Sequence, residues 1–193
     1  MADIYNNFEE LKKNNTNWVD YFIEYDISSE NNILIMAIHW WEIEPSTTQI
    51  AKKISKDNDF SFYSFLWKFG LHITSTNFDE PKALELAEKH KLIITIHGCR
   101  WDEDFIYVWW RNSEIREALI KEFLDNWFNS PSFEDIPIPL KWQHINNICN
   151  KWKLKEWIQI EISKNLRNKL AEDEELLNKF SFVIKKTLKN FKI

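Results

Sequence analysis

Glycine is nearly absent from this chain, and tryptophan is abundant instead. The sequence holds two glycines and eleven tryptophans among 193 residues, whereas an average domain contains about 7% glycine. Glycine adopts positive φ angles at little steric cost, so a chain this poor in glycine has few residues suited to tight turns. Tryptophan pairs stand where open, glycine-like backbone would make sense, at Trp40–Trp41 and Trp109–Trp110.

This pattern favours the hypothesis that many of the tryptophans are UGA codons that the source organism reads as glycine. The Asn-, Lys- and Ile-rich composition fits an AT-rich gene. The alternative is a protein that is simply rich in tryptophan. UGG codons at these positions would exclude the recoding hypothesis.

The bulk properties limit the classes of partner. A formal net charge of −5 argues against a general nucleic-acid binder, and a polyanionic substrate would need a local cationic pocket. Two cysteines, Cys99 and Cys149, are too few for a disulfide scaffold. The length suits one domain over residues 1–193, which we expect to be a monomer.

The N-terminal segment carries no export signal that we can recognise. Residues 1–10 are polar and acidic, without the basic and apolar regions of a secretory signal. No apolar run approaches membrane-spanning length. We therefore expect a cytoplasmic protein with no membrane partner, which would meet an extracellular substrate only after lysis or through another export route.

The hydrophobic pattern predicts an α/β fold. Two short, continuous apolar runs, 33–38 and 92–96, are typical of strands buried on both faces. Further strands are expected at 19–27, 60–66, 104–108 and 157–163, and helices at 46–57, 81–90, 113–127 and 173–191. Ser46 is a suitable N-cap and Pro81 suits a first helical turn. The alternation predicts a three-layer domain with a mixed, partly parallel sheet.

Two histidines follow the two central apolar runs. His39 ends the first run and His97 ends the second, so both should emerge at the carboxyl edge of the sheet, where open α/β sheets bind ligands. Glu42 and Glu44 come shortly after His39. Catalytic zinc commonly takes two His and one Glu, so His39, Glu44 and His97 are candidate ligands. The alternative is that the two glutamates are solvated loop residues.

Glu161 lies in a strictly alternating segment, 158–163, in which the isoleucines share one face. Its carboxylate either meets solvent or points into a cleft. In a zinc hydrolase it would act as the general base on the activated water and then return the proton to the leaving amine.

Two arginines are candidate substrate ligands. Arg111 follows Trp109–Trp110, and its guanidinium could bind a substrate carboxylate or stabilise an oxyanion. The alternative is an arginine at the start of a surface helix. Arg167 follows the predicted strand at 157–163 and has the same two interpretations.

The remaining histidines and Cys99 have weaker functional signals. His72 could line the cleft and contact substrate, or it could be a hydrogen-bonded structural residue. His90 is expected to interact with a helix C-terminus. Cys99 is only two residues from His97, too near in the chain for an opposed Cys–His pair, so we expect a buried thiol.

Several motifs in order resemble the poly-γ-glutamate hydrolase family of bacteria and phages. They lie at 36–45 (MAIHWWEIEP), 71–75, 78–81, 96–99, 107–111 (YVWWR), 147–150 and 159–163 (QIEIS). The resemblance runs from about residue 18 to residue 168. It departs from the family where Trp40, Trp41, Trp109 and Trp110 replace glycines; Trp67, Trp101, Trp142, Trp152 and Trp157 also fall at or near family glycines.

The resemblance implies a compact zinc carboxypeptidase-like α/β fold and hydrolysis of γ-glutamyl amide bonds. It places the metal ligands on His39, Glu44 and His97, with the H-x4-E spacing selecting Glu44 over Glu42. It places the general base on Glu161. Two other functions stay open: a zinc peptidase or amidase acting on cell-wall peptides, and an inactive polymer-binding protein whose real tryptophans plug the cleft.

Overall fold

The computed structural model describes residues 4–29, 31–39, 44–67, 73–110, 113–136 and 157–191. In chain order its elements are α1 (Phe8–Asn14), β1 (Tyr21–Asp26), β2 (Ile33–Ala37), α2 (Thr47–Asn58), β3 (Ser61–Trp67), α3 (Pro81–Lys89), β4 (Leu92–Cys99), β5 (Ile106–Trp110), α4 (Ser113–Asp125), β6 (Trp157–Ser163), α5 (Lys164–Glu172) and α6 (Glu174–Leu188). None of these helices combines the length and apolar character that crossing a membrane requires.

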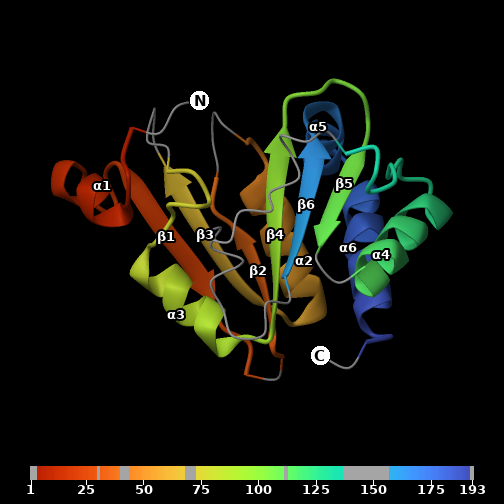
Figure 1. Cartoon of the computed structure of the whole chain (residues 1–193), viewed down its shortest axis with the longest axis horizontal. Helices are drawn as coiled ribbons and strands as arrows, with labels where there is room; N and C mark the ends of the chain where they lie inside the picture. Colours follow the sequence, from red (N-terminus) through yellow and green to blue (C-terminus); the bar gives the residue numbers. More distant parts are fainter. Residues whose placement is uncertain are drawn as a thin grey trace.

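The strands form one mixed sheet in the order β1-β3-β2-β4-β6-β5. The four central strands, β3, β2, β4 and β6, are parallel, and the edge strands β1 and β5 run antiparallel to their neighbours. The arrowheads of the parallel strands therefore point to one edge of the sheet (Figure 1). Side chains at the carboxyl ends of these strands gather along that edge.

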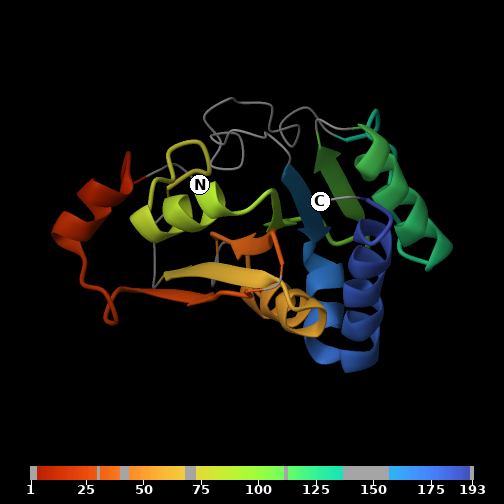
Figure 2. The same ribbon diagram turned by 90° about the horizontal axis from the view of Figure 1, so that it is seen from below.

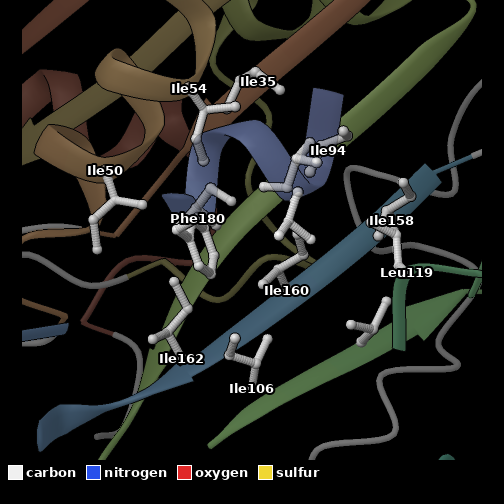
Figure 3. Packing of buried hydrophobic residues seen from close by; sticks show 14 of the residues in the cluster. Ile35, Ile50, Ile54, Ile94, Ile106, Leu119, Ile158, Ile160, Ile162 and Phe180 are labelled. Atoms are coloured by element: carbon white, nitrogen blue, oxygen red, sulfur yellow. The ribbon is translucent and has the colours of Figure 1, made fainter. Parts of the chain in front are cut away.

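One face of the sheet is covered by α2, α4, α5 and α6. Alternate isoleucines of the central strands, such as Ile35, Ile94 and Ile160, point to this face and are fully buried. Ile54 of α2 and Phe180 of α6 pack against them (Figure 3). The strict alternation along β6 thus sends its isoleucines into this core and its polar residues to the opposite face.

The other face is covered by α1 and α3. Leu86 of α3 and Leu11 of α1 join a second apolar cluster with Met36 of β2 and Phe65 of β3. Figure 2 shows α3 on one side of the sheet and α2, α5 and α6 on the other. The predicted three-layer α/β architecture with a mixed, partly parallel sheet is therefore confirmed.

Some local predictions need correction. Helices α1 and α5 were not predicted, and β4 continues past residue 96 to Cys99, so that His97 lies within the strand rather than after it. Ser46 occupies the N-cap of α2, but its side chain makes no capping bond and its φ is 71°. Pro81 opens α3 as predicted, with the carboxylate of Glu80 accepting from the amide of Ala83.

Candidate metal centre

The chain brings His39 and His97 together at the point where the sheet connections diverge. β2 and β4 are neighbours, but β2 leads through α2 to β3 on one side, whereas β4 leads on to β5 and β6 on the other. Such a switch point is where open α/β sheets leave a crevice at their carboxyl edge. The two imidazole rings lie 5.2 Å apart between centroids, and both residues are buried.

The carboxylate of Glu44 lies between the two rings. Its Oε1 is 3.1 Å from Nδ1 of His39, and its Oε2 is 3.3 Å from Nδ1 of His97. One donor atom from each of these three residues lies within 4.8 Å of the others. Two imidazole nitrogens and one carboxylate oxygen form a donor set that suits zinc and leaves room for further ligands.

The hydrogen bonds of His39 also suit a metal ligand. Its Nε2 lies 3.2 Å from the main-chain carbonyl of Ile73, while its Nδ1 faces Glu44. A neutral imidazole has one N–H to donate and one lone pair to offer. With the N–H directed to Ile73, the lone pair of Nδ1 is left for a cation, which is the arrangement typical of metal-binding histidines.

Charge interactions connect the three candidate ligands. Burial opposes the charge on Glu44, but His39 and His97 outweigh it and hold the pKa of this carboxyl well below its usual range. Burial likewise disfavours charge on His97, but Glu44 and then Glu161 raise its pKa above the ordinary value. The cluster therefore favours positive charge at its centre, which a divalent cation can supply in place of protons.

Thr47, a residue that our sequence reasoning missed, links the segments that carry two of the candidate ligands. Its hydroxyl lies 2.7 Å from the carbonyl of His39 and 2.9 Å from that of Glu44. Both contacts are buried, and Thr47 is the first residue of α2. The signal available in the sequence was a hydroxyl residue three positions after the acidic ligand.

Glu161 lies beside the candidate ligands on the next strand. It pairs in register with His97 between β6 and β4, so both side chains leave the same face of the sheet. Its carboxylate is buried, and Oε1 accepts a hydrogen bond of 2.8 Å from the amide of Gln159. Burial raises the pKa of Glu161, with His97 opposing this shift and Glu44 adding to it.

The family model for poly-gamma-glutamate hydrolase matches residues 5–191. The chain belongs to the poly-γ-glutamate hydrolase family. Its curated relatives include UPF0714 protein YndL of Bacillus subtilis, 35% identical over 87% of this chain and 67% of YndL. The SPbeta prophage-derived protein YoqZ of the same organism is 34% identical, over 88% of this chain and 62% of YoqZ. The chain thus spans about two thirds of the length of these relatives.

Solved structures share the fold of this family member. A bacteriophage poly-gamma-glutamate hydrolase superposes with a TM-score of 0.87 at 24% identity, covering 98% of each chain. The zinc-free apo form of YndL superposes with a TM-score of 0.86 at 32% identity, again covering 98% of each chain. The zinc carboxypeptidase-like α/β fold implied by the resemblance is therefore confirmed.

In this member of the poly-γ-glutamate hydrolase family, Arg167 has contacts that differ from those we expected. It is 2% exposed. Its guanidinium donates to three main-chain carbonyls: those of Pro45 at 2.6 Å, Ile162 at 3.2 Å and Cys99 at 3.2 Å. Three of the five N–H donors of this guanidinium therefore contact the protein backbone, and the binding of a substrate carboxylate by Arg167 stays a prediction.

The remaining candidate residues from the sequence are two side chains that the structure does not describe and two that it places away from the metal cluster or buries. Arg111 and His72 lie outside the described residues, as do Trp40, Trp41 and Cys149. Cys99 is a buried thiol, as predicted, and burial raises its pKa to about 12. His90 caps α3, with Nδ1 2.6 Å from the carbonyl of Leu86 and Nε2 2.8 Å from the hydroxyl of Ser61.

Proposed function

We propose that this chain is a zinc-dependent hydrolase that cleaves the γ-glutamyl amide bonds of poly-γ-glutamate. The observation that carries the proposal is the buried set of His39, Glu44 and His97 at the carboxyl edge of the sheet, with Glu161 on the adjacent strand. Membership of the family supplies the substrate class. The relative YndL, solved in a zinc-free form, supports zinc as the metal.

In this mechanism His39, Glu44 and His97 would hold the metal, with the two Nδ1 atoms and the carboxylate as the available donors. A bound zinc supplies polarisation of the scissile carbonyl and activation of water near neutral pH. Glu44 also accepts the amide N–H of Gly98 through Oε2 at 3.0 Å, which fixes the orientation of the carboxylate. The contacts of Oε2 with the amide of Gly98 and with Nδ1 of His97 keep Glu44 in place between the two rings.

Glu161 is the general base in this proposal. Its carboxylate takes a proton from the attacking water and then delivers that proton to the nitrogen of the leaving γ-glutamyl amide. A general base works best when its pKa approaches the working pH, and burial moves the pKa of Glu161 upward in that direction. The hydrogen bond from Gln159 holds Oε1 and leaves Oε2 for the water.

Arg111 completes the proposed site as the residue that binds a substrate carboxylate and stabilises the oxyanion, and His72 as a further substrate contact. Every residue of the polymer carries a free carboxylate, which a guanidinium can bind through two parallel hydrogen bonds. Arg111→Lys should therefore raise KM for the polymer, because a lysine ammonium cannot reproduce the paired geometry.

The test is digestion of poly-γ-glutamate by the purified chain, before and after chelation and after addition of zinc. We expect activity to disappear with the chelator and to return with zinc, while His90→Gln, a histidine variant outside the metal cluster, behaves like the unaltered chain. Activity that is indifferent to the chelator would exclude the metal mechanism. Equal release from α-linked glutamyl oligomers would instead indicate a general peptidase, and binding without cleavage an inactive polymer-binding protein.

A further inference from the structure

Arg167 joins three pieces of backbone that surround the metal centre. Pro45 directly follows the ligand Glu44, Cys99 lies two residues after the ligand His97, and Ile162 directly follows Glu161. The carbonyls of all three accept hydrogen bonds from one guanidinium. Arginine offers five N–H donors in a rigid plane, so a single side chain can hold these segments at fixed separations.

The position of this guanidinium depends on Gly98. A Cβ atom built on Gly98 would lie 2.6 Å from Nη1 of Arg167 and closer still to Cζ, so the arginine occupies the space that a side chain would fill. The amide of Gly98 also donates to Glu44. Gly98 therefore contacts both Glu44 and Arg167, and Arg167 in turn holds the carbonyl of Pro45, the residue after Glu44.

We infer that Arg167 is a positioning residue that sets the geometry of the metal ligands, and that Gly98 is glycine in order to admit it. This inference rests on the proposed zinc site. Because buried carbonyls that lose their donor relax or seek water, the loop that carries Glu44 shifts when the guanidinium is removed. Outer residues that orient metal ligands typically change metal affinity by about 10- to 100-fold.

The test is a double-substitution cycle on the affinity for zinc alone, measured by competition with a chromogenic chelator. Arg167→Ala and Gly98→Ala are each expected to weaken zinc binding by about 10- to 100-fold. In the Arg167→Ala background, Gly98→Ala should add no further loss, because the Cβ then has room. Lys169→Met, on the same helix and half-exposed, is the matched control and should bind zinc like the unaltered chain.

The visible spectrum of the cobalt-substituted protein gives a readout that a loss of general stability does not move. We expect Arg167→Ala to alter this spectrum and Lys169→Met to leave it unchanged. Arg167→Lys serves if the alanine variant does not fold, and it should recover part of the affinity. Unchanged zinc affinity in a folded arginine variant, or fully additive losses in the cycle, would overturn the inference. Tight zinc binding without polymer cleavage would overturn only the proposed function.

Trp127 lies two residues after the end of helix α4 and has a φ of 67°. The amide of Trp127 donates to the carbonyl of Leu124 and the amide of Phe128 to that of Phe123, each at 3.0 Å. These are the two bonds of a Schellman motif, and the rings of Phe123 and Phe128 make the apolar contact that accompanies it. Trp127 therefore occupies the position that glycine normally takes, and its side chain is 91% exposed.

Trp18 has the same backbone conformation in a turn. The amide of Val19 donates to the carbonyl of Thr16 at 3.1 Å, which places Trp18 third in a four-residue turn with a φ of 68°. Turns with a positive φ at the third residue, such as type II turns, require glycine or asparagine there. A bulky residue at positive φ is an outlier, yet two of the four described residues other than glycine with positive φ are tryptophans.

Two buried tryptophans, Trp109 and Trp157, have indole N–H groups that lack acceptors among the described residues. The indoles of Trp109 and Trp157 stack with centroids 4.4 Å apart, and within the described part of the chain neither Nε1 has a hydrogen-bond partner. Buried indole N–H groups usually find an acceptor. Trp109 pairs in register with Gln159, on the face of the sheet that carries Glu161.

We propose that Trp18, Trp109, Trp127 and Trp157 are glycines in the chain as its own organism makes it. Glycine at 18 and 127 removes the steric strain of a bulky residue at positive φ. Glycine at 109 and 157 removes two buried N–H donors that lack acceptors in the part of the chain that the structure describes, and it opens space for the polymer beside Gln159 and Glu161. This last consequence rests on the proposed function, whereas the identity of the residues does not.

Mass spectrometry of the natural protein reads these residues directly, and glycine masses at 18, 109, 127 and 157 are expected. Tryptophan at those positions would overturn the proposal. As a second measurement, Trp127→Gly and Trp18→Gly in the printed chain should each raise Tm by about 2–4 °C. Trp67→Gly is the control and should lower Tm, because the indole of Trp67 is buried and donates to the carbonyl of Ile38 at 3.0 Å. A fall in Tm for both exposed positions would contradict the backbone argument.

Discussion

His97 and Glu161 are register partners on the adjacent parallel strands β4 and β6. Parallel pairing sends partner side chains to the same face, so the main-chain hydrogen bonds of the sheet hold a candidate metal ligand and a candidate general base side by side. Both are buried, and Ile96 beside His97 and Ile160 and Ile162 beside Glu161 anchor the strands on the opposite face. The sheet therefore fixes this pair more rigidly than loops could.

Replacement of the candidate base should separate catalysis from metal binding. Glu161→Gln keeps the shape of the side chain but cannot accept the proton, so kcat on poly-γ-glutamate should fall by about 10²–10⁴-fold. The zinc affinity should change little, because Glu161 is not one of the three proposed ligands. Steady-state kinetics together with a zinc titration check this. Glu80→Gln, a buried carboxyl that caps α3, is the matched control, and an active Glu161→Gln variant would disprove the assignment.

The same variant should be more stable than the unaltered chain when metal is absent. Burial raises the pKa of Glu161 in the folded protein, so the folded state favours the protonated form. The contribution of Glu161 to folding stability is fully present below its pKa in the unfolded chain, about 4.3. It is lost as the pH rises through the raised pKa of the folded protein. The Tm advantage of Glu161→Gln should therefore be absent at low pH and grow towards neutrality. Thermal unfolding with chelator at several pH values measures it, and an advantage that shrinks with rising pH would contradict the sign.

Substitutions in the apolar core between the sheet and α6 should lower the free energy of unfolding and leave zinc binding unchanged. Phe180 of α6 is fully buried, with its ring 5.2 Å from that of Phe123 and 5.6 Å from that of Phe128. Phe180→Ala should cost about 3–5 kcal/mol of unfolding free energy, as measured by denaturant titration. Zinc affinity of the folded variant should be unchanged, because the metal centre lies at the edge of the sheet and Phe180 packs against its face.

Much of the fold was predictable because the strands have distinct patterns. Continuous apolar residues in β2 and β4 indicated strands buried on both faces, and the alternation in β6 separated its isoleucines from its polar residues, although every residue of β6 is buried. All six strands were expected near their observed positions. Helix α5 was missed because it begins directly after β6 with no turn residue, and it carries only Leu166 and Leu170 as buried apolar residues. Helix α1 is only seven residues long, too short for its periodicity to indicate a helix.

The candidate metal cluster was predictable for a topological reason, and its surroundings were not. His39 and His97 meet because parallel neighbours end at one edge, which the apolar runs already implied. The contacts of Arg167 depend on a missing Cβ at Gly98 and on carbonyls far apart in the sequence. No spacing rule encodes such a contact, so nothing in the sequence indicated these main-chain hydrogen bonds.

The hydroxyl of Thr47 offers the cleanest test of how the ligands are oriented. It contacts the carbonyls of both His39 and Glu44, so Thr47→Val keeps the volume and removes the link. Zinc affinity should fall by about 10- to 100-fold, in a competition assay with a chelator. Thr48→Val is the matched control, since Thr48 is also buried in α2 but bonds to Ser64 at 2.5 Å. Equal losses in the two variants would mean that the first turn of α2 matters only for folding, whereas a loss confined to Thr47 shows that this hydroxyl orients the metal ligands.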